Sequence, residues 1–130
     1  MSGFVSPAWL KHGCPFSFKF LLFMAEAGLL GHIKIIEMVE DEGNFVKTKE
    51  ELSAKLGKPA TFPTVEVEPC VYMSDSDKLI DYFSSQCGID LDTLEALPFY
   101  KRGLMQRSLR KIRDCRAYME KYGPLEDRQA

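Results

Sequence analysis

The chain has 130 residues, which suits one compact domain with its own hydrophobic core. A hydrophobic fraction of 45%, a charged fraction of 28% and a net charge of -2 are typical of a globular protein and argue against an overall attraction to nucleic acid or acidic membranes. The longest apolar run, Phe20 to Ala25, is too short to cross a bilayer.

The N-terminus and the cysteines bear on the compartment. Met1-Ser2-Gly3 has neither the basic nor the apolar region of a secretory signal, so we expect a cytoplasmic protein whose thiols stay reduced. No CxxC spacing occurs and only His12 and His32 could join the cysteines, so we expect no metal site. The cysteines are widely separated: Cys14, Cys70, Cys87 and Cys115.

A strand and then a helix are expected at the start of the chain. Phe4-Val5 and Ala8 to Leu10 suit a short first strand, which Pro7 is expected to break. After a turn, the apolar run that follows Cys14 predicts a helix to Ala27, where a glycine comes next and stops it.

The following segment predicts a second strand and a second helix. His32 to Met38 is rich in isoleucine and reads as a strand parallel to the first, reached through the helical crossover. Glu40 to Asn44 is an acidic loop. Thr48 and Glu51 have the spacing of a capping box, which predicts a helix start at Thr48 and an end near Leu56-Gly57.

A hairpin and a closing helix are expected next. Thr64 to Glu68 alternates in polarity like a half-exposed strand, Pro69-Cys70 is a turn, and Val71 to Met73 is a short strand. Ser74 to Asp77 supplies cap residues for a helix that ends before Gly88.

The predicted order is β-α-β-α-β-β-α over residues 1–88, followed by a helical tail of one or two helices over residues 89–130. A parallel β-α-β half joined to a hairpin and a closing helix is the thioredoxin plan. We therefore expect a thioredoxin-like α/β domain with a C-terminal helical extension.

The tail combines an apolar stripe with a basic remainder. The stripe recurs at steps of three and four: Met105, Leu109, Ile112, Cys115, Met119 and Tyr122. Its basic residues are Lys101, Arg102, Arg107, Arg110, Lys111, Arg113, Arg116 and Lys121. Such a face can bind nucleic acid, an acidic lipid surface or an acidic partner. The basic residues are not interleaved with aromatic ones, so we expect a solvated face packed against the acidic N-terminal part. We expect neither nucleic acid nor a membrane as a partner. The apolar stripe leaves a homodimer as an open possibility.

The segment Gly13-Cys14-Pro15-Phe16-Ser17 places Cys14 in the first turn of its helix. Unpaired backbone N–H groups and the helix dipole stabilise a thiolate there. Pro15 suits the first helical position, which has no hydrogen bond to lose. The position three residues after Cys14, where a partner cysteine could form a disulfide with it, is occupied by Ser17. Any thiol chemistry at this turn therefore uses one cysteine.

Three motifs in this order carry a resemblance. Gly13 to Ser17 resembles the active-site turn of glutaredoxins and of cysteine-type glutathione transferases, such as the omega and dehydroascorbate reductase classes. Thr61-Phe62-Pro63-Thr64-Val65 is similar to the cis-proline segment of both groups, and Ser74 to Phe83 is similar to the Ser-Glu/Asp-Ser helix start of the transferase N-terminal domain. The resemblance covers residues 4 to 87.

The resemblance implies a site for glutathione, which would be the cosubstrate. Cys14 would be the catalytic nucleophile, with Ser17 and the helix N-terminus stabilising its thiolate. The Phe62 backbone, beside a cis bond to Pro63, would bind the cysteinyl part of glutathione.

The two ends of glutathione would bind elsewhere. By the same resemblance, Asp75 and Ser76 hold the γ-glutamyl end, with Asp77 in that role if the glutaredoxin register applies. Lys11 or Lys58 would meet the glycyl carboxylate.

Plainer interpretations of these residues stay open. Pro63 can be a trans proline that starts a strand, and Ser74 to Asp77 can be a helix cap alone. Ser17 can merely fill the first helical turn. His12 can assist the ionisation of Cys14, although an exposed turn histidine is the preferred interpretation. We expect the other three cysteines to be bystanders.

Together these features predict a glutathione-binding monothiol thiol transferase, in which Cys14 forms a mixed disulfide with glutathione. The short segment after Cys87 disfavours the helical electrophile pocket of full transferases, and Ser17 removes an intramolecular disulfide, so exchange is favoured over conjugation. The alternative is a non-catalytic interaction or adaptor module that uses the basic C-terminal helix.

Overall fold

The structure, a computed structural model, describes residues 4–122 and is mixed α/β, as expected. Its four-stranded sheet has the order β2-β1-β3-β4. The elements up to residue 88 follow the predicted order: β1 (Ser6–Lys11), α1 (Pro15–Glu26), β2 (Ile33–Met38), α2 (Phe45–Leu56), β3 (Thr64–Glu68), β4 (Val71–Ser74) and α3 (Ser76–Cys87).

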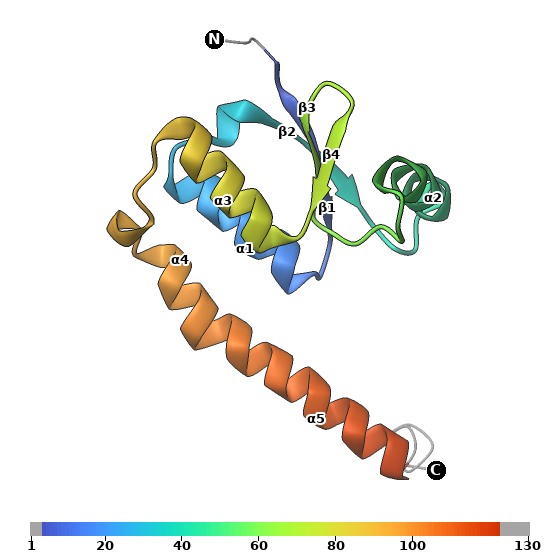
Figure 1. Cartoon of the computed structure of the whole chain (residues 1–130). Coiled ribbons are helices and arrows are strands. Elements are labelled where there is room, and N and C mark those ends of the chain that lie inside the picture. The colour runs from blue at the N-terminus through green and yellow to red at the C-terminus, as the bar shows by residue number, and fades with distance from the viewer. Residues whose placement is uncertain (1–3, 123–130) are drawn as a thin grey trace. The chain divides into compact units, whose positions relative to one another are not determined.

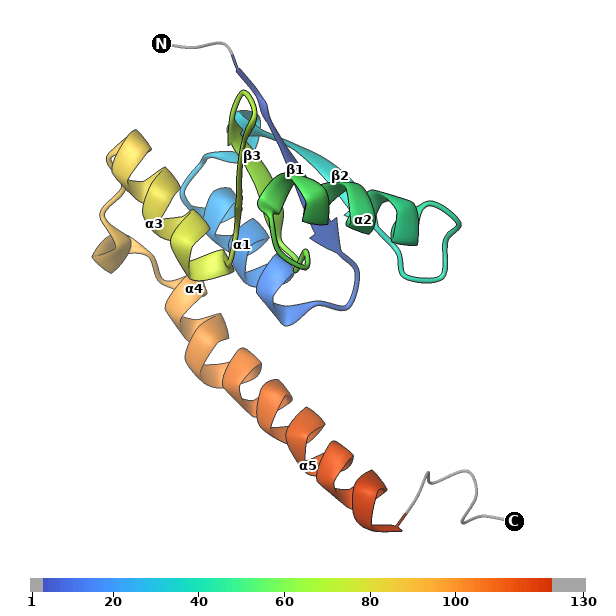
Figure 2. The ribbon, with the colours of Figure 1, turned by 45° about the vertical axis from the view of Figure 1, so that its right-hand side comes forward.

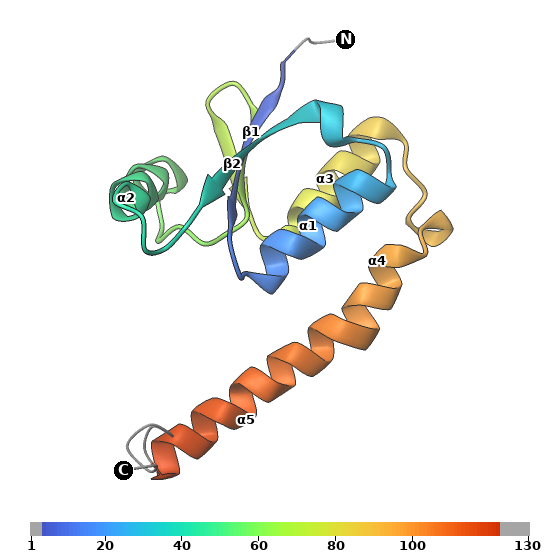
Figure 3. The same ribbon diagram turned by 180° about the vertical axis from the view of Figure 1, so that it is seen from behind.

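Helices cover both faces of the sheet. Figure 1 shows α1 and α3 side by side on one face and α2 on the other, and the view from behind in Figure 3 agrees. Alternate residues of β1 are buried, so each face of the strand contributes to a different core. The core under α1 and α3 includes Ala8, Phe20, Val65 and Phe83. The core under α2 is formed by Met38, Phe45, Leu52, Ala60 and Phe62.

Strand register brings three distant segments to one edge of the sheet. β1 is parallel to β2 and antiparallel to β3, which is antiparallel to β4. Trp9 lies opposite Thr64, and Thr64 lies opposite Ser74. The end of β1, the start of β3 and the end of β4 therefore leave the sheet close together.

Pro7 does not break the first strand. It lies opposite Lys34 in the parallel pairing with β2, whereas the antiparallel pairs with β3 begin at Ala8. Near the start of a strand, a proline can stand where the neighbouring strand does not need a hydrogen bond from its backbone nitrogen. The predicted break is therefore wrong, and β1 continues through Pro7.

Helix α2 begins a turn earlier than the capping-box pattern predicts. Asn44 is its N-cap, and the Thr48 N–H donates to the Asn44 carbonyl, so Thr48 lies inside the helix. The buried ring of Phe45 packs 5.8 Å from that of Phe62, measured between ring centroids. This tertiary packing favours the extra turn, and the predicted start at Thr48 is wrong.

The chain divides into two compact units, with the boundary between Leu97 and Pro98. Leu94 and Leu97 belong to the core under α1 and α3. The second unit contains a π-helical segment, Tyr100–Met105, followed by α5 (Gln106–Tyr122). Figure 2 shows α5 as a long helical ribbon. In α5 the stripe residues Ile112 and Met119 are 43% and 48% exposed. The side chain of Tyr122, the last stripe residue, lies outside the described part.

No helix among the described residues is long and apolar enough to span a membrane.

A carboxylate at the end of α1 caps a helical segment about 70 residues further along the chain. Glu26 accepts hydrogen bonds from the N–H groups of Glu95 and Ala96, both at 2.7 Å, and of Leu97 at 2.9 Å. These residues start α4 (Ala96–Phe99), whose first N–H groups have no partner within the helix. The bond from Ala96, with smaller contributions from Leu97 and Glu95, holds the pKa of Glu26 below its ordinary value against an opposing desolvation effect.

We predict that Glu26→Gln lowers the melting temperature at pH 7 by about 3–6 °C, because a neutral amide oxygen is a weaker cap than a carboxylate. Since the folded-state pKa is depressed, the stabilisation is present above the unfolded-state pKa and is lost as the pH falls through the folded value. The gap between variant and wild type should therefore narrow toward pH 3 in thermal melts followed by circular dichroism. Glu50→Gln on the exposed face of α2 is the matched control, and an equal effect from it would contradict the assignment.

Candidate functional site

The turn between β1 and α1 presents Cys14 at a helix start. Gly13 has a φ of +75°, which favours glycine, and the Cys14 N–H donates to the Lys11 carbonyl at 3.3 Å. Cys14 is the N-cap of α1 with Pro15 directly after it, and its side chain makes no capping hydrogen bond. Cys14 therefore stands at the N-terminus of α1, the position that the sequence predicts.

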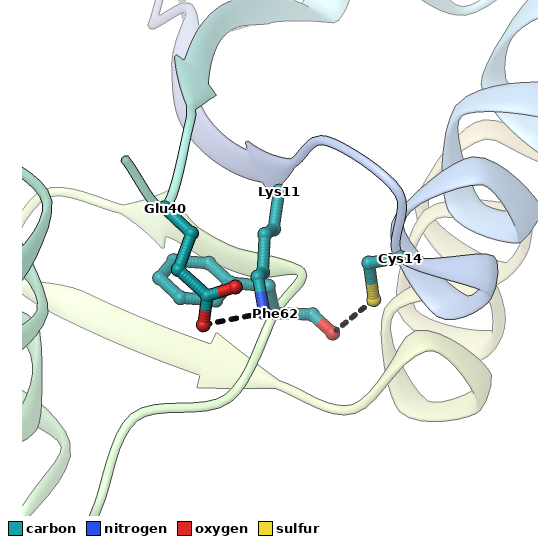
Figure 4. A network of polar contacts seen from close by, with 4 residues as sticks. All are labelled: Lys11, Cys14, Glu40 and Phe62. Atoms are coloured by element: carbon teal, nitrogen blue, oxygen red, sulfur yellow. Dashed lines mark hydrogen bonds and ion pairs between the residues drawn. The ribbon is translucent and has the colours of Figure 1, made fainter. Parts of the chain in front are cut away.

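Cys14 faces the segment that precedes β3. The Phe62-Pro63 peptide bond is cis, as predicted, and the Cys14 thiol donates to the Phe62 carbonyl oxygen at 3.6 Å. Figure 4 shows the carbonyl of Phe62 turned toward Cys14 and its ring turned away. The ring lies in the core under α2, so the packing of Phe62 orients the backbone that meets the half-buried thiol.

Ser17 joins the two sides of the turn. Its buried hydroxyl accepts a hydrogen bond from the Lys11 N–H at 3.1 Å, which ties the end of β1 to the first turns of α1. A hydroxyl that accepts one bond still has its own hydrogen to donate. Ser17 therefore has a structural role, which is to accept the hydrogen bond from Lys11. Its role in stabilising a Cys14 thiolate stays a prediction.

The start of α3 has a constrained backbone. Asp75 is the N-cap, with φ of 82° and ψ of 113°, and its carboxylate accepts a hydrogen bond from the Asp77 N–H at 3.0 Å. A residue other than glycine in this region costs about 1–3 kcal/mol, and such residues cluster at functional sites. Asp75 is exposed and Ser76 is buried. They follow Ser74 directly, at the edge of the sheet where Pro63 precedes Thr64.

Lys19 is a site residue that the sequence reasoning missed. Its side chain is 5% exposed, and its ammonium lies 2.8 Å from a carboxylate oxygen of Asp77. This ion pair joins the helix that begins after Cys14 to the first turn of α3. The signal was a single lysine within an apolar helical run, because lysine is almost never fully buried unless it is paired.

The cations at the turn have acidic partners on the β2 side. Lys11 pairs with Glu40 at 3.4 Å, as Figure 4 shows, and the His12 ring lies 2.7 Å from a carboxylate oxygen of Glu37. His12 is an exposed turn histidine, the preferred interpretation. Lys58, the other predicted partner for a glycyl carboxylate, is exposed after α2.

The other cysteines lie on different elements. Cys70 is exposed at the tip of the β3–β4 hairpin, and Cys87 is half-buried at the end of α3. Cys115 is exposed on α5, in the second unit. All three are free thiols, like Cys14.

Comparison of the chain with protein-family models and with curated proteins found no match.

The cost of the backbone conformation at Asp75 can be measured from the unfolding free energies of variants. We predict that Asp75→Gly is at least as stable as wild type, because glycine adopts a φ of 82° without the steric cost and loses only a few tenths of a kcal/mol as an N-cap. Asp75→Ala should lose about 1 kcal/mol, since it keeps the strained backbone and loses the cap. Urea unfolding of both variants measures the difference. Equal losses would show that backbone strain at this position is unimportant.

Proposed function

We propose that residues 4–87 form a thioredoxin-like domain that binds glutathione and exchanges thiols at Cys14. The contact between the Cys14 thiol and the Phe62 carbonyl, next to Pro63, is the observation that carries this proposal. It joins a helix-start cysteine to a backbone segment suited to an extended peptide-like ligand. The element order and the strand order β2-β1-β3-β4 also support it.

The three parts of glutathione have matching groups around the thiol. Its cysteinyl part would pair with the backbone of Phe62, which brings the ligand sulfur toward Cys14. Its γ-glutamyl end carries a carboxylate and an ammonium group. The carboxylate suits the N–H groups at the start of α3, and the ammonium suits the exposed Asp75 carboxylate.

The glycyl end has a candidate partner in Lys11. Its ion pair with Glu40 is exposed, since the Glu40 side chain is 68% accessible, and exposed pairs contribute about 0–1 kcal/mol. A ligand carboxylate can therefore replace Glu40 at small cost. The Lys11 ammonium also lies 5.8 Å from the centroid of the Phe45 ring, and this cation–π contact helps to hold the ammonium in place.

The reaction is two successive thiol–disulfide exchanges. The Cys14 thiolate attacks the glutathione sulfur of a mixed disulfide GS–SR, a Cys14–glutathione disulfide forms, and RS⁻ leaves and takes up a proton. The thiolate of a second glutathione then attacks the glutathione sulfur of this adduct. Oxidised glutathione leaves, and Cys14 returns as a thiolate. Ser17 supplies no second thiol, so both steps use one protein cysteine.

A second candidate function is an adaptor that docks an acidic partner through α5. The observation that favours it is the surface of that helix. The stripe residues Ile112, Cys115 and Met119 are exposed, and the acidic residues of α5 are Asp114 and Glu120. The exposed basic residues of this helix are Arg107, Arg110, Lys111, Arg113, Arg116 and Lys121.

We predict that treatment with oxidised glutathione adds one glutathione to Cys14, which mass spectrometry of tryptic peptides locates. Reduced glutathione should reverse the adduct. Cys14→Ser should abolish the adduct at this position and lower thiol-transfer activity by about 100-fold or more, because it removes the nucleophile. Cys70→Ser, which removes an exposed thiol at the tip of the β3–β4 hairpin, is the control and should retain activity. Full transfer activity in Cys14→Ser would overturn the mechanism.

Titration calorimetry distinguishes the two functions. We predict that Cys14→Ser binds reduced glutathione with a dissociation constant in the millimolar range or below, because the backbone and helix-start contacts remain. Absence of binding by folded protein at millimolar glutathione would contradict the transferase and leave the adaptor as the better proposal.

A further inference from the structure

Lys19 combines a buried cation with an exposed partner. Its side chain is 5% exposed, whereas that of Asp77 is 67% exposed. The ammonium lies 2.8 Å from the Asp77 carboxylate and 5.6 Å from the centroid of the Phe16 ring. The stem of Lys19 is therefore packed within the molecule, while its charge is delivered to the first turn of α3.

Stability alone gives a poor account of this charge. Buried ion pairs are often replaced by apolar residues of similar volume without loss, because removing an ammonium from water costs as much as the pair returns. The side chain of Lys19 is buried, so a methionine of similar length and volume is the apolar replacement to compare with it. The reason for a lysine at this position is therefore sought in the charge that it places at the start of α3.

That helix start is crowded with negative charge. Asp75 and Asp77 are two residues apart, and the carboxylate of Asp75 already accepts the Asp77 N–H. The γ-glutamyl end of glutathione would bring a third carboxylate. A helix N-terminus attracts an anion with only about half a unit of positive charge, which two nearby aspartates offset. Lys78 on the same turn is exposed, whereas Lys19 is held directly against Asp77 and offsets one of the two aspartate charges.

We propose that Lys19 is a positioning residue for the proposed glutathione site. It acts through Asp77: by compensating that carboxylate, it lets the start of α3 accept the γ-glutamyl carboxylate. The pair also joins the helix of Cys14 to the helix that holds the ligand. This inference rests on the proposed function, but it concerns affinity for glutathione rather than the chemistry at sulfur.

The test compares Lys19→Met, Asp77→Asn and the double variant in the full chain. Lys19→Met should raise both the KM and the calorimetric Kd for reduced glutathione about tenfold, with kcat within about twofold, because Asp77 loses the cation held against it. The increase should shrink at high salt, which screens exposed charges. Lys19→Arg, which keeps the cation, should bind nearly as well as wild type. Adding Asp77→Asn to Lys19→Met should restore most of the affinity, because it removes the charge that Lys19 compensates.

Several results would overturn the inference. A double variant as weak as Lys19→Met would show that Lys19 does not act through the charge of Asp77. Loss of kcat together with stability, without a change in KM, would show a structural role alone. If Lys19→Met does not fold, Lys19→Gln replaces it, since it keeps a long polar side chain without the charge. A KM for Lys19→Gln equal to that of Lys19→Arg then contradicts the proposal.

The wild-type protein separates this inference from the function on which it rests. Wild type that binds glutathione, with Lys19→Met binding equally well, contradicts the role of Lys19 alone. Wild type that neither binds glutathione nor forms a Cys14 adduct contradicts both.

Discussion

The candidate site depends on the central position of β1, which pairs with β2 on one side and β3 on the other. This pairing puts Trp9, Thr64 and Ser74 in one row across the sheet. The turn before Cys14, the cis-proline segment and the start of α3 therefore leave the sheet at the same edge. A shift of one residue in this register would also move the apolar residues of a strand to the opposite face.

At the start of α3 and on α1, two residues depart from local preferences, and the rest of the fold supports them. Asp75 has a φ that favours glycine, and Lys19 is a buried cation in an apolar helix. The packing of α1 against α3, with Phe20 and Phe83 at 5.9 Å between ring centroids, holds the two helix starts together. Departures of this kind are expected where a binding or catalytic site constrains the chain.

Much of the fold was predictable because its signals are local. Helix ends at Gly57 and Gly88 and the β3–β4 hairpin were located by glycine positions and alternating polarity. The start of α2 was not, because the packing of Phe45 adds a turn before the capping-box pattern at Thr48. Of the site, the cysteine and the cis proline were found from motifs, whereas their contact needed the folded backbone.

By itself the sequence determined the order of the strands and helices and the helix-start position of Cys14. These follow from periodicity, turn residues and proline placement within a few neighbouring residues. Only the tertiary structure decided the partners of Cys14, Lys19 and Glu26. Their contacts join residues 48, 58 and 71 positions apart. No local pattern encodes such a pairing, because it arises when the sheet register and the packing of helices on the sheet bring the groups together.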